Sequence, residues 1–237
     1  TDGDFHYALA GRDLVVLKAW PAVELAEIGR VKLPVSASSF FLLGNKKIAA
    51  LSGTWFYDYN EEGEKPFDGV PPSEPTSGGA EPFPAEDQRS ALQDIPFNGS
   101  GTILSVIDVA DPANPVLVDV RLFEGNLMGS RRIDNVVYLA LSVPPRVPYD
   151  WMWIPSVAYS QDEAERLAAM DEWADQIKAE IDAMSQEELL LHYYDGIVSA
   201  DAGQGLEYGA GKALLACDSY YQPNVYSGAN LMAVVAV

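Results

Sequence analysis

Two stretches of this 237-residue chain repeat the same order of short apolar segments and turns, and this repeat restricts the fold most. Residues 14–52 contain four such segments, and residues 103–142 contain four more in the same order. In the second stretch, the turn Asp111–Pro115 follows the first segment and the turn Asp134-Asn135 precedes the last. Pro112 fixes its own φ, and Asp and Asn tolerate a positive φ, so both turns end strands.

The spacing of matching phrases supports a structural repeat. Val31-Lys32-Leu33 precedes Val120-Arg121-Leu122 by 89 positions, and Leu51-Ser52 precedes Leu141-Ser142 by 90. A unit of about 40 residues with four short strands is typical of a β-propeller blade. A sandwich or barrel also contains many short strands, but neither explains why one four-strand pattern recurs. We therefore expect four consecutive antiparallel strands over Ile103–Leu141.

The two ends of the chain resemble parts of further units. The opening segment Asp2–Phe5 is similar to the last hairpin of a preceding unit, and Leu231–Val237 is similar to the first strand, Ile103–Val109. The predicted fold of residues 1–237 is thus a single mainly β domain, with two full and two partial four-stranded antiparallel propeller-like blades and a helical insertion. An apolar strand at a chain end needs a partner. We expect a piece of a longer chain, and free strand edges through which copies self-associate.

Two long segments separate the repeats. Residues 54–101 form a Pro-rich excursion, with six prolines between Pro66 and Pro84, and are too poor in apolar residues there to order themselves. Residues 143–230 form an insertion with the strongest helical signal, which lies near residues 161–192.

Two capping boxes mark the helices of this insertion. Ser160 and Glu163 begin a predicted helix over Gln161–Met184, and Ser185 with Glu188 begins a short one that ends near His192. The apolar residues of the long helix recur at three- and four-residue steps and predict an inward face. They are Leu167, Met170, Ala174, Ile177 and Ile181.

Two phrases of the second repeat resemble a known family. Residues 103–118 read strand, Asp-Val-x-Asp-Pro-x-Asn-Pro, strand, and residues 125–139 contain Ser-Arg-x-Ile-Asp-x-x-x-Tyr-Leu. With the opening Thr1–Phe5 and the phrase Leu-Leu-Leu-His-Tyr-Tyr-Asp at 189–195, they resemble the secreted bacterial and archaeal proteins whose β-propeller is distantly related to WD repeats. The resemblance implies a secreted, periplasmic or cell-surface location and a longer full-length chain. It brings no catalytic residues with it.

The charge of the chain excludes several partner classes. Fifteen basic and thirty-five acidic residues give a net charge of −20, which repels nucleic acid and anionic membrane surfaces. The longest apolar run, Leu231–Val237, is far shorter than the roughly 20 residues of a transmembrane helix. The sequence therefore predicts neither nucleic-acid binding nor a transmembrane segment.

One acidic loop has part of a calcium-loop pattern. Asp58, Asn60 and Glu62 place oxygen ligands at its first, third and fifth positions, but its twelfth position is Gly69 rather than the bidentate Glu such a loop needs. The sequence favours a solvated acidic loop. Ca²⁺ held by these three residues is the alternative, and Ca²⁺ is the only cofactor that the sequence suggests.

Aromatic residues gather in the excursions rather than in the repeats, where they form either a glycan- or protein-binding face or the anchors of long loops. Anchoring is the favoured interpretation. The candidate ligand-binding residues are Trp55, Tyr57, Trp151, Trp153, Tyr220 and Tyr221.

No nucleophile, base and orienting group converge in the sequence, and no catalytic residue is predicted. The first functional hypothesis is a non-enzymatic binding or interaction module of an exported protein, with a protein or glycan as its partner. The alternative is a carbohydrate-active hydrolase that uses a pair of carboxylates and aromatic sugar platforms.

Overall fold

The computed structural model describes residues 3–56, 97, 99–144, 162–197, 207–221, 224–225 and 230–237. The chain divides into two compact units. The first contains residues 1–142, 193–212 and 232–237, and the second contains residues 143–192 and 213–231.

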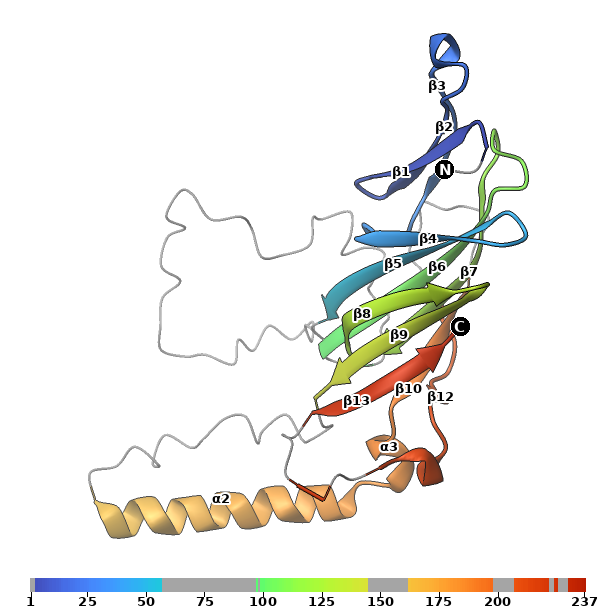
Figure 1. The fold of residues 1–237 in the computed structure, drawn as a ribbon. Coiled ribbons are helices and arrows are strands. Elements are labelled where there is room, and N and C mark those ends of the chain that lie inside the picture. Colours follow the sequence, from blue (N-terminus) through green and yellow to red (C-terminus); the bar gives the residue numbers. More distant parts are fainter. Residues whose placement is uncertain are drawn as a thin grey trace. The chain divides into compact units, whose positions relative to one another are not determined.

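In the part of the first unit that the structure describes, the strands form three antiparallel sheets (Figure 1). The strands are β1 (Phe5–Ala10), β2 (Asp13–Lys18), β3 (Ala26–Lys32), β4 (Ser39–Leu43), β5 (Lys47–Phe56), β6 (Gly99–Asp108), β7 (Val116–Glu124), β8 (Asn126–Ile133), β9 (Val136–Val143), β10 (His192–Ile197), β11 (Glu207–Tyr208), β12 (Lys212–Ala213) and β13 (Leu231–Ala236), with a 3₁₀ turn η1 (Ala22–Glu24) between β2 and β3. The sheets have the orders β1-β2-β3, β11-β10-β7-β6-β5-β4 and β13-β9-β8, and β12 also pairs with β10. The three sheets are not closed into one ring of strands.

The central sheet is built on a four-stranded unit, β4 to β7, in which each strand pairs with the next. The pairing of β5 with β6 extends from Lys47 opposite Asp108 to Phe56 opposite Gly99. Both strands reach into the range that the sequence assigned to the excursion, because the ladder continues to Phe56 and resumes at Gly99.

The predicted strands and turns of residues 103–141 are confirmed, but their assignment to a single blade is wrong. The strands β6 and β7 complete the sheet begun by β4 and β5, whereas β8 and β9 pair with β13. One four-stranded unit therefore lies between two three-stranded sheets, instead of two full and two partial blades. This grouping was not visible in the sequence, because β5 and β6 pair although a long excursion separates them. Such a pairing is possible because the entropic cost of closing a loop increases only slowly with its length.

A β-bulge recurs at the same place in two sheets. The register shifts between Val16 and Leu17 in the β2–β3 pair, and again between Val106 and Ile107 in the β6–β7 pair, 90 positions later. The repeat is therefore structural. Leu14 is opposite Val31, and Leu104 is opposite Arg121, so Val31 corresponds to Arg121. The 89-residue alignment of Val31 with Val120 was wrong by one position, which would exchange the two faces of the strand.

Both long insertions occupy the same connection in successive sheets. Residues 57–98 join β5 to β6, and residues 144–230 join β9 to β13, which are the equivalent strands. Figure 1 shows β13, in red, beside β9 despite this separation in sequence. Part of the second insertion returns as β10, which pairs with the outer strand β7 of the central sheet.

A set of charged side chains holds β10 and β12 on that edge. Asp195 of β10 accepts a hydrogen bond from Lys212 of β12 and lies 3.7 Å from the Arg121 guanidinium of β7. The carboxylate of Asp195 raises the pKa of Lys212. These side chains are substantially exposed, so water screens their charges. The ion pairs therefore help to align the strands and contribute little to the free energy of unfolding.

The core of the first unit lies between the first and central sheets. Leu14 and Val16 of β2 pack with Ile48 of β5 and Ile107 of β6, all completely buried. A second cluster, around Ile103 and Val120, continues the core along the central sheet. Apolar residues on alternate positions of each strand supply both clusters, as the period-two pattern requires.

In the second unit, α2 spans Glu163–Ala183. This agrees closely with the predicted range, but its N-cap is Asp162, whose carboxylate accepts from the Ala164 and Glu165 amides, 2.9 and 3.2 Å away. Of the predicted inward face, Ile177 is buried, whereas Leu167 is 54 % exposed. The predicted stripe is therefore only partly inward.

The second capping box is confirmed. The Glu188 carboxylate accepts from the Ser185 amide and hydroxyl, and the helix it begins, α3, spans Gln186–Leu189. His192 does not end this helix, as the sequence suggested, but begins β10. A short 3₁₀ turn, η5 (Cys217–Ser219), follows β12.

Gly29 of β3 supports the approach of the first sheet to the β6–β7 turn. A Cβ there would lie 2.2 Å from the Pro112 carbonyl oxygen. We expect Gly29→Ala to lower the free energy of unfolding by about 1–3 kcal/mol, as overpacking does. Gly53→Ala is the matched control, because a Cβ on Gly53 meets nothing within 4 Å. Urea denaturation of both variants measures the difference, and equal midpoints would contradict this packing.

The Asp111 carboxylate organises the β6–β7 turn. It accepts from the Asn114 side chain at 2.8 Å and from the Ala113 amide at 3.1 Å, and these bonds lower the pKa of Asp111. A lowered pKa stabilises the fold above roughly pH 4 and loses this contribution as the pH falls through the folded-state value. We expect Asp111→Ala to lower the melting temperature at pH 7, with the difference from the natural protein shrinking toward pH 3. Asn114→Ala should give the same trend; a difference independent of pH would refute it.

Candidate functional site

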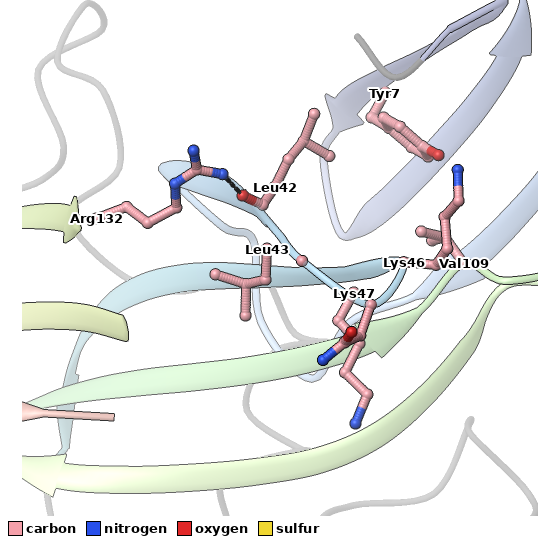
Figure 2. Close-up of a pocket in the computed structure, with 9 residues that line it drawn as sticks. Tyr7, Leu42, Leu43, Lys46, Lys47, Val109 and Arg132 are labelled. Atoms are coloured by element: carbon pink, nitrogen blue, oxygen red, sulfur yellow. Dashed lines mark hydrogen bonds between the residues drawn. The ribbon is translucent and has the colours of Figure 1, made fainter. Parts of the chain in front are cut away.

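A cavity of about 530 Å³ opens in the first unit at the β4–β5 hairpin (Figure 2). Residues of all three sheets line it. They are Tyr7 of β1, Leu42 and Leu43 of β4, Gly44, Asn45 and Lys46 of the turn, Lys47 of β5, Val109 after β6, and Arg132 of β8.

The turn between β4 and β5 has a backbone that the sequence specifies. Asn45 and Lys46 have φ angles of 60° and 56°, in the left-handed region that Asn enters more readily than most residues. The amide of Val109 donates to the Lys46 carbonyl oxygen at 2.9 Å and so connects the turn to the end of β6. The position of Lys46 is therefore set by backbone contacts.

Two hydrogen bonds join this hairpin to the β8–β9 hairpin. The Gly44 amide donates to Asn135 Oδ1 at 2.8 Å, and the Arg132 guanidinium donates to the Leu42 carbonyl oxygen. A Cβ at Gly44 would lie 2.4 Å from Asn135 Oδ1, so any larger residue there would displace the Asn135 side chain. Figure 2 shows Arg132 reaching across to Leu42 from β8. The cavity thus has walls from two neighbouring hairpins.

The charged side chains that line the cavity are all basic. Lys46, Lys47 and Arg132 are exposed, and no acidic residue is among the described residues that line it. Figure 2 shows Lys46 extending toward Tyr7, while Lys47 and Arg132 lie on other sides of the hairpin. The positive charge therefore surrounds the hairpin instead of meeting at one point. Such a rim attracts anions and disfavours metal cations.

The cavity lies at the end of the central sheet that carries short turns. β5 begins there, at Lys47, and runs ten residues to Phe56, where residues 57–98 depart. At about 3.3 Å per residue, the two ends of this strand are roughly 30 Å apart. The cavity and the start of the excursion are therefore at opposite ends of β5.

The predicted aromatic residues are not brought together in the part of the chain that the structure describes. The Tyr220 hydroxyl accepts a hydrogen bond from the Leu191 amide at 3.0 Å within the second unit, and Tyr221 is 83 % exposed. Trp55 pairs through its backbone with Ser100, but the position of its side chain is not described. Tyr57, Trp151 and Trp153 lie outside the described residues. The ligand-binding role of these six residues stays a prediction.

The predicted calcium ligands Asp58, Asn60 and Glu62 also lie outside the described residues. Within the described ranges, no three side chains of His, Cys, Asp or Glu are grouped as a metal site would need. The calcium hypothesis therefore also stays a prediction.

The cavity residues were not recognised as a site from sequence. The signal was present: Gly44-Asn45 is a turn followed by two lysines, and Arg131-Arg132 precedes the turn Asp134-Asn135. Each pair alone is an ordinary solvated charge at a turn. Only the hydrogen bonds between the two hairpins show that the pairs are neighbours.

The chain forms antiparallel sheets one after another, with a four-stranded central unit and a register shift that recurs after 90 residues. These features define a β-repeat protein built from propeller-type blades. The model of the Beta propeller domain family matches residues 1–237, and the chain belongs to this family. Searches of curated proteins and of solved structures found no match.

No helix within the described ranges is both long and apolar enough to cross a membrane.

Asn135 is the acceptor that joins the two hairpins. We expect Asn135→Ala to speed hydrogen exchange of the Gly44 amide several-fold, because the amide loses its partner. Asn135→Asp keeps an acceptor oxygen and should leave exchange slow. Site-resolved exchange by NMR measures both, and unchanged exchange in Asn135→Ala would show that this contact does not form in solution.

Proposed function

We propose that this chain is a binding module of an exported protein, and that it holds a small ligand in the cavity at the β4–β5 hairpin. Membership of the Beta propeller domain family supports a binding or interaction role at a coarse level. The resemblance to secreted propeller proteins supports the export.

The observation that carries the proposal is the construction of the cavity. Its volume, about 530 Å³, lies within the range of roughly 300–1,000 Å³ that small-molecule sites occupy. Two hydrogen bonds fix its hairpin: the Gly44 amide donates to Asn135 Oδ1, and the Val109 amide donates to the Lys46 carbonyl oxygen. A site that is already formed loses little conformational entropy when a ligand binds.

The lining also combines the two kinds of surface that a ligand needs. Leu42 and Leu43, both half-buried, offer apolar surface, and the exposed Asn45 amide and lysine ammonium groups offer hydrogen-bond donors. Binding sites of small molecules typically pair apolar walls with a few polar groups in this way.

The test is an NMR titration with a panel of monosaccharides, amino acids and short peptides, both neutral and charged. We expect at least one probe to shift the amide signals of Leu42–Lys47 and Val109, and to be recovered chemically unchanged. Signals of β10, which two strands separate from β5 in the central sheet and which contributes no lining residue, serve as the internal control. Probes that shift no cavity signal, or that are converted to a product, would overturn the proposal.

A further inference from the structure

The positive charge at the cavity contrasts with the charge of the whole chain. Three of its fifteen basic residues line this one cavity, in a protein of net charge −20. They come from two separate hairpins, 85 or more positions apart in sequence, so the cluster is produced by the fold. Positive charge gathered at one cavity favours a ligand that carries negative charge.

Two of these cations retain binding capacity. Arg132 uses one guanidinium donor on the Leu42 carbonyl oxygen, and the group carries five N–H donors in all. Lys47 is opposite Asp108 in the ladder, yet the Asp108 carboxylate accepts from the Ala110 amide at 2.8 Å, and no ion pair joins it to Lys47 among the described residues. Both side chains are exposed and can turn toward a ligand.

We propose that the cavity binds a small ligand that carries a carboxylate or phosphate group on a neutral, sugar-sized body. This inference rests on the proposed function and specifies the ligand's chemistry. Lysine and arginine donate charge-assisted hydrogen bonds to both groups, and such bonds are about twice as strong as neutral ones. The half-buried Leu42 and Leu43 side chains provide the apolar surface for the uncharged body of the ligand.

The net charge of the chain also explains why the ligand should be small. At physiological ionic strength the Debye length is about 8 Å, so a small anion in the cavity interacts mainly with the nearby cations. An extended polyanion, such as nucleic acid, would also approach the acidic remainder of the surface and be repelled. The charge distribution therefore selects small anions over polymeric ones.

The test compares three matched probes: glucose, glucuronate and glucose 6-phosphate. Their dissociation constants are measured by NMR titration of the natural protein at 0.15 M salt. We expect glucuronate, glucose 6-phosphate or both to bind at the cavity, and glucose to bind at least about tenfold more weakly, as loss of a charged hydrogen bond predicts. The two charged arms distinguish a carboxylate from a phosphate ligand.

Variants of one exposed lysine connect binding to charge. Lys47→Gln should weaken binding of the charged probe about threefold to tenfold, and Lys47→Glu should weaken it further. Lys32→Gln, at an exposed position of β3 away from the cavity, removes the same charge and should leave binding unchanged. Melting temperatures of all three variants establish that they fold.

The outcomes separate the two proposals. If glucose binds as tightly as the charged probes, or if Lys32→Gln weakens binding as much as Lys47→Gln, the inference about charge is wrong while the binding module stands. If neither charged probe shifts the cavity signals while a neutral member of the wider panel does, the inference also fails alone. Absence of any binding at the cavity overturns both.

Discussion

The pairing of β5 with β6 is the interaction on which the rest of the first unit depends. It extends over all ten residues of each strand, and it closes the loop formed by residues 57–98. The side chains of these strands supply Ile48, Ile103 and Ile107 to the core, all fully buried. Without this pair, β4 and β7 would have no central strands to pair with. The β4–β5 hairpin that lines the cavity would then no longer be part of a sheet.

Repeats and turns were predictable from sequence because they depend on local chemistry. Asp134 indeed adopts a positive φ of 53°, and the predicted turn at Asp111–Pro115 separates β6 from β7. The grouping of strands into sheets was not predictable, because it depends on pairings across long insertions. The one-position error at Val31 has a different origin: similar residue triplets were matched at a spacing of 89, whereas the strand pairing places the equivalent positions 90 apart.

The candidate site shows a different limit of sequence analysis. The aromatic residues and acids of the excursions stand out in composition, whereas the cavity is built from common residues at two turns. Its specificity arises from contact between positions 90 or more apart, such as Gly44 with Asn135 and Leu42 with Arg132. Turn chemistry predicts each hairpin separately, but it contains no information about which hairpins meet.

Short turns and long insertions lie at opposite ends of the paired strands. The turn at Lys46, the turn at Asp134-Asn135 and the start of the Asp111 turn occupy one end of the paired strands, because antiparallel neighbours alternate direction. Both long insertions leave from the opposite ends, after Phe56 and after β9. Short turns are fixed by few residues and vary little in conformation, so a preformed site is best built on them. Long insertions can change in length and sequence at little cost to the sheets, since they are attached at ends that the cavity does not use.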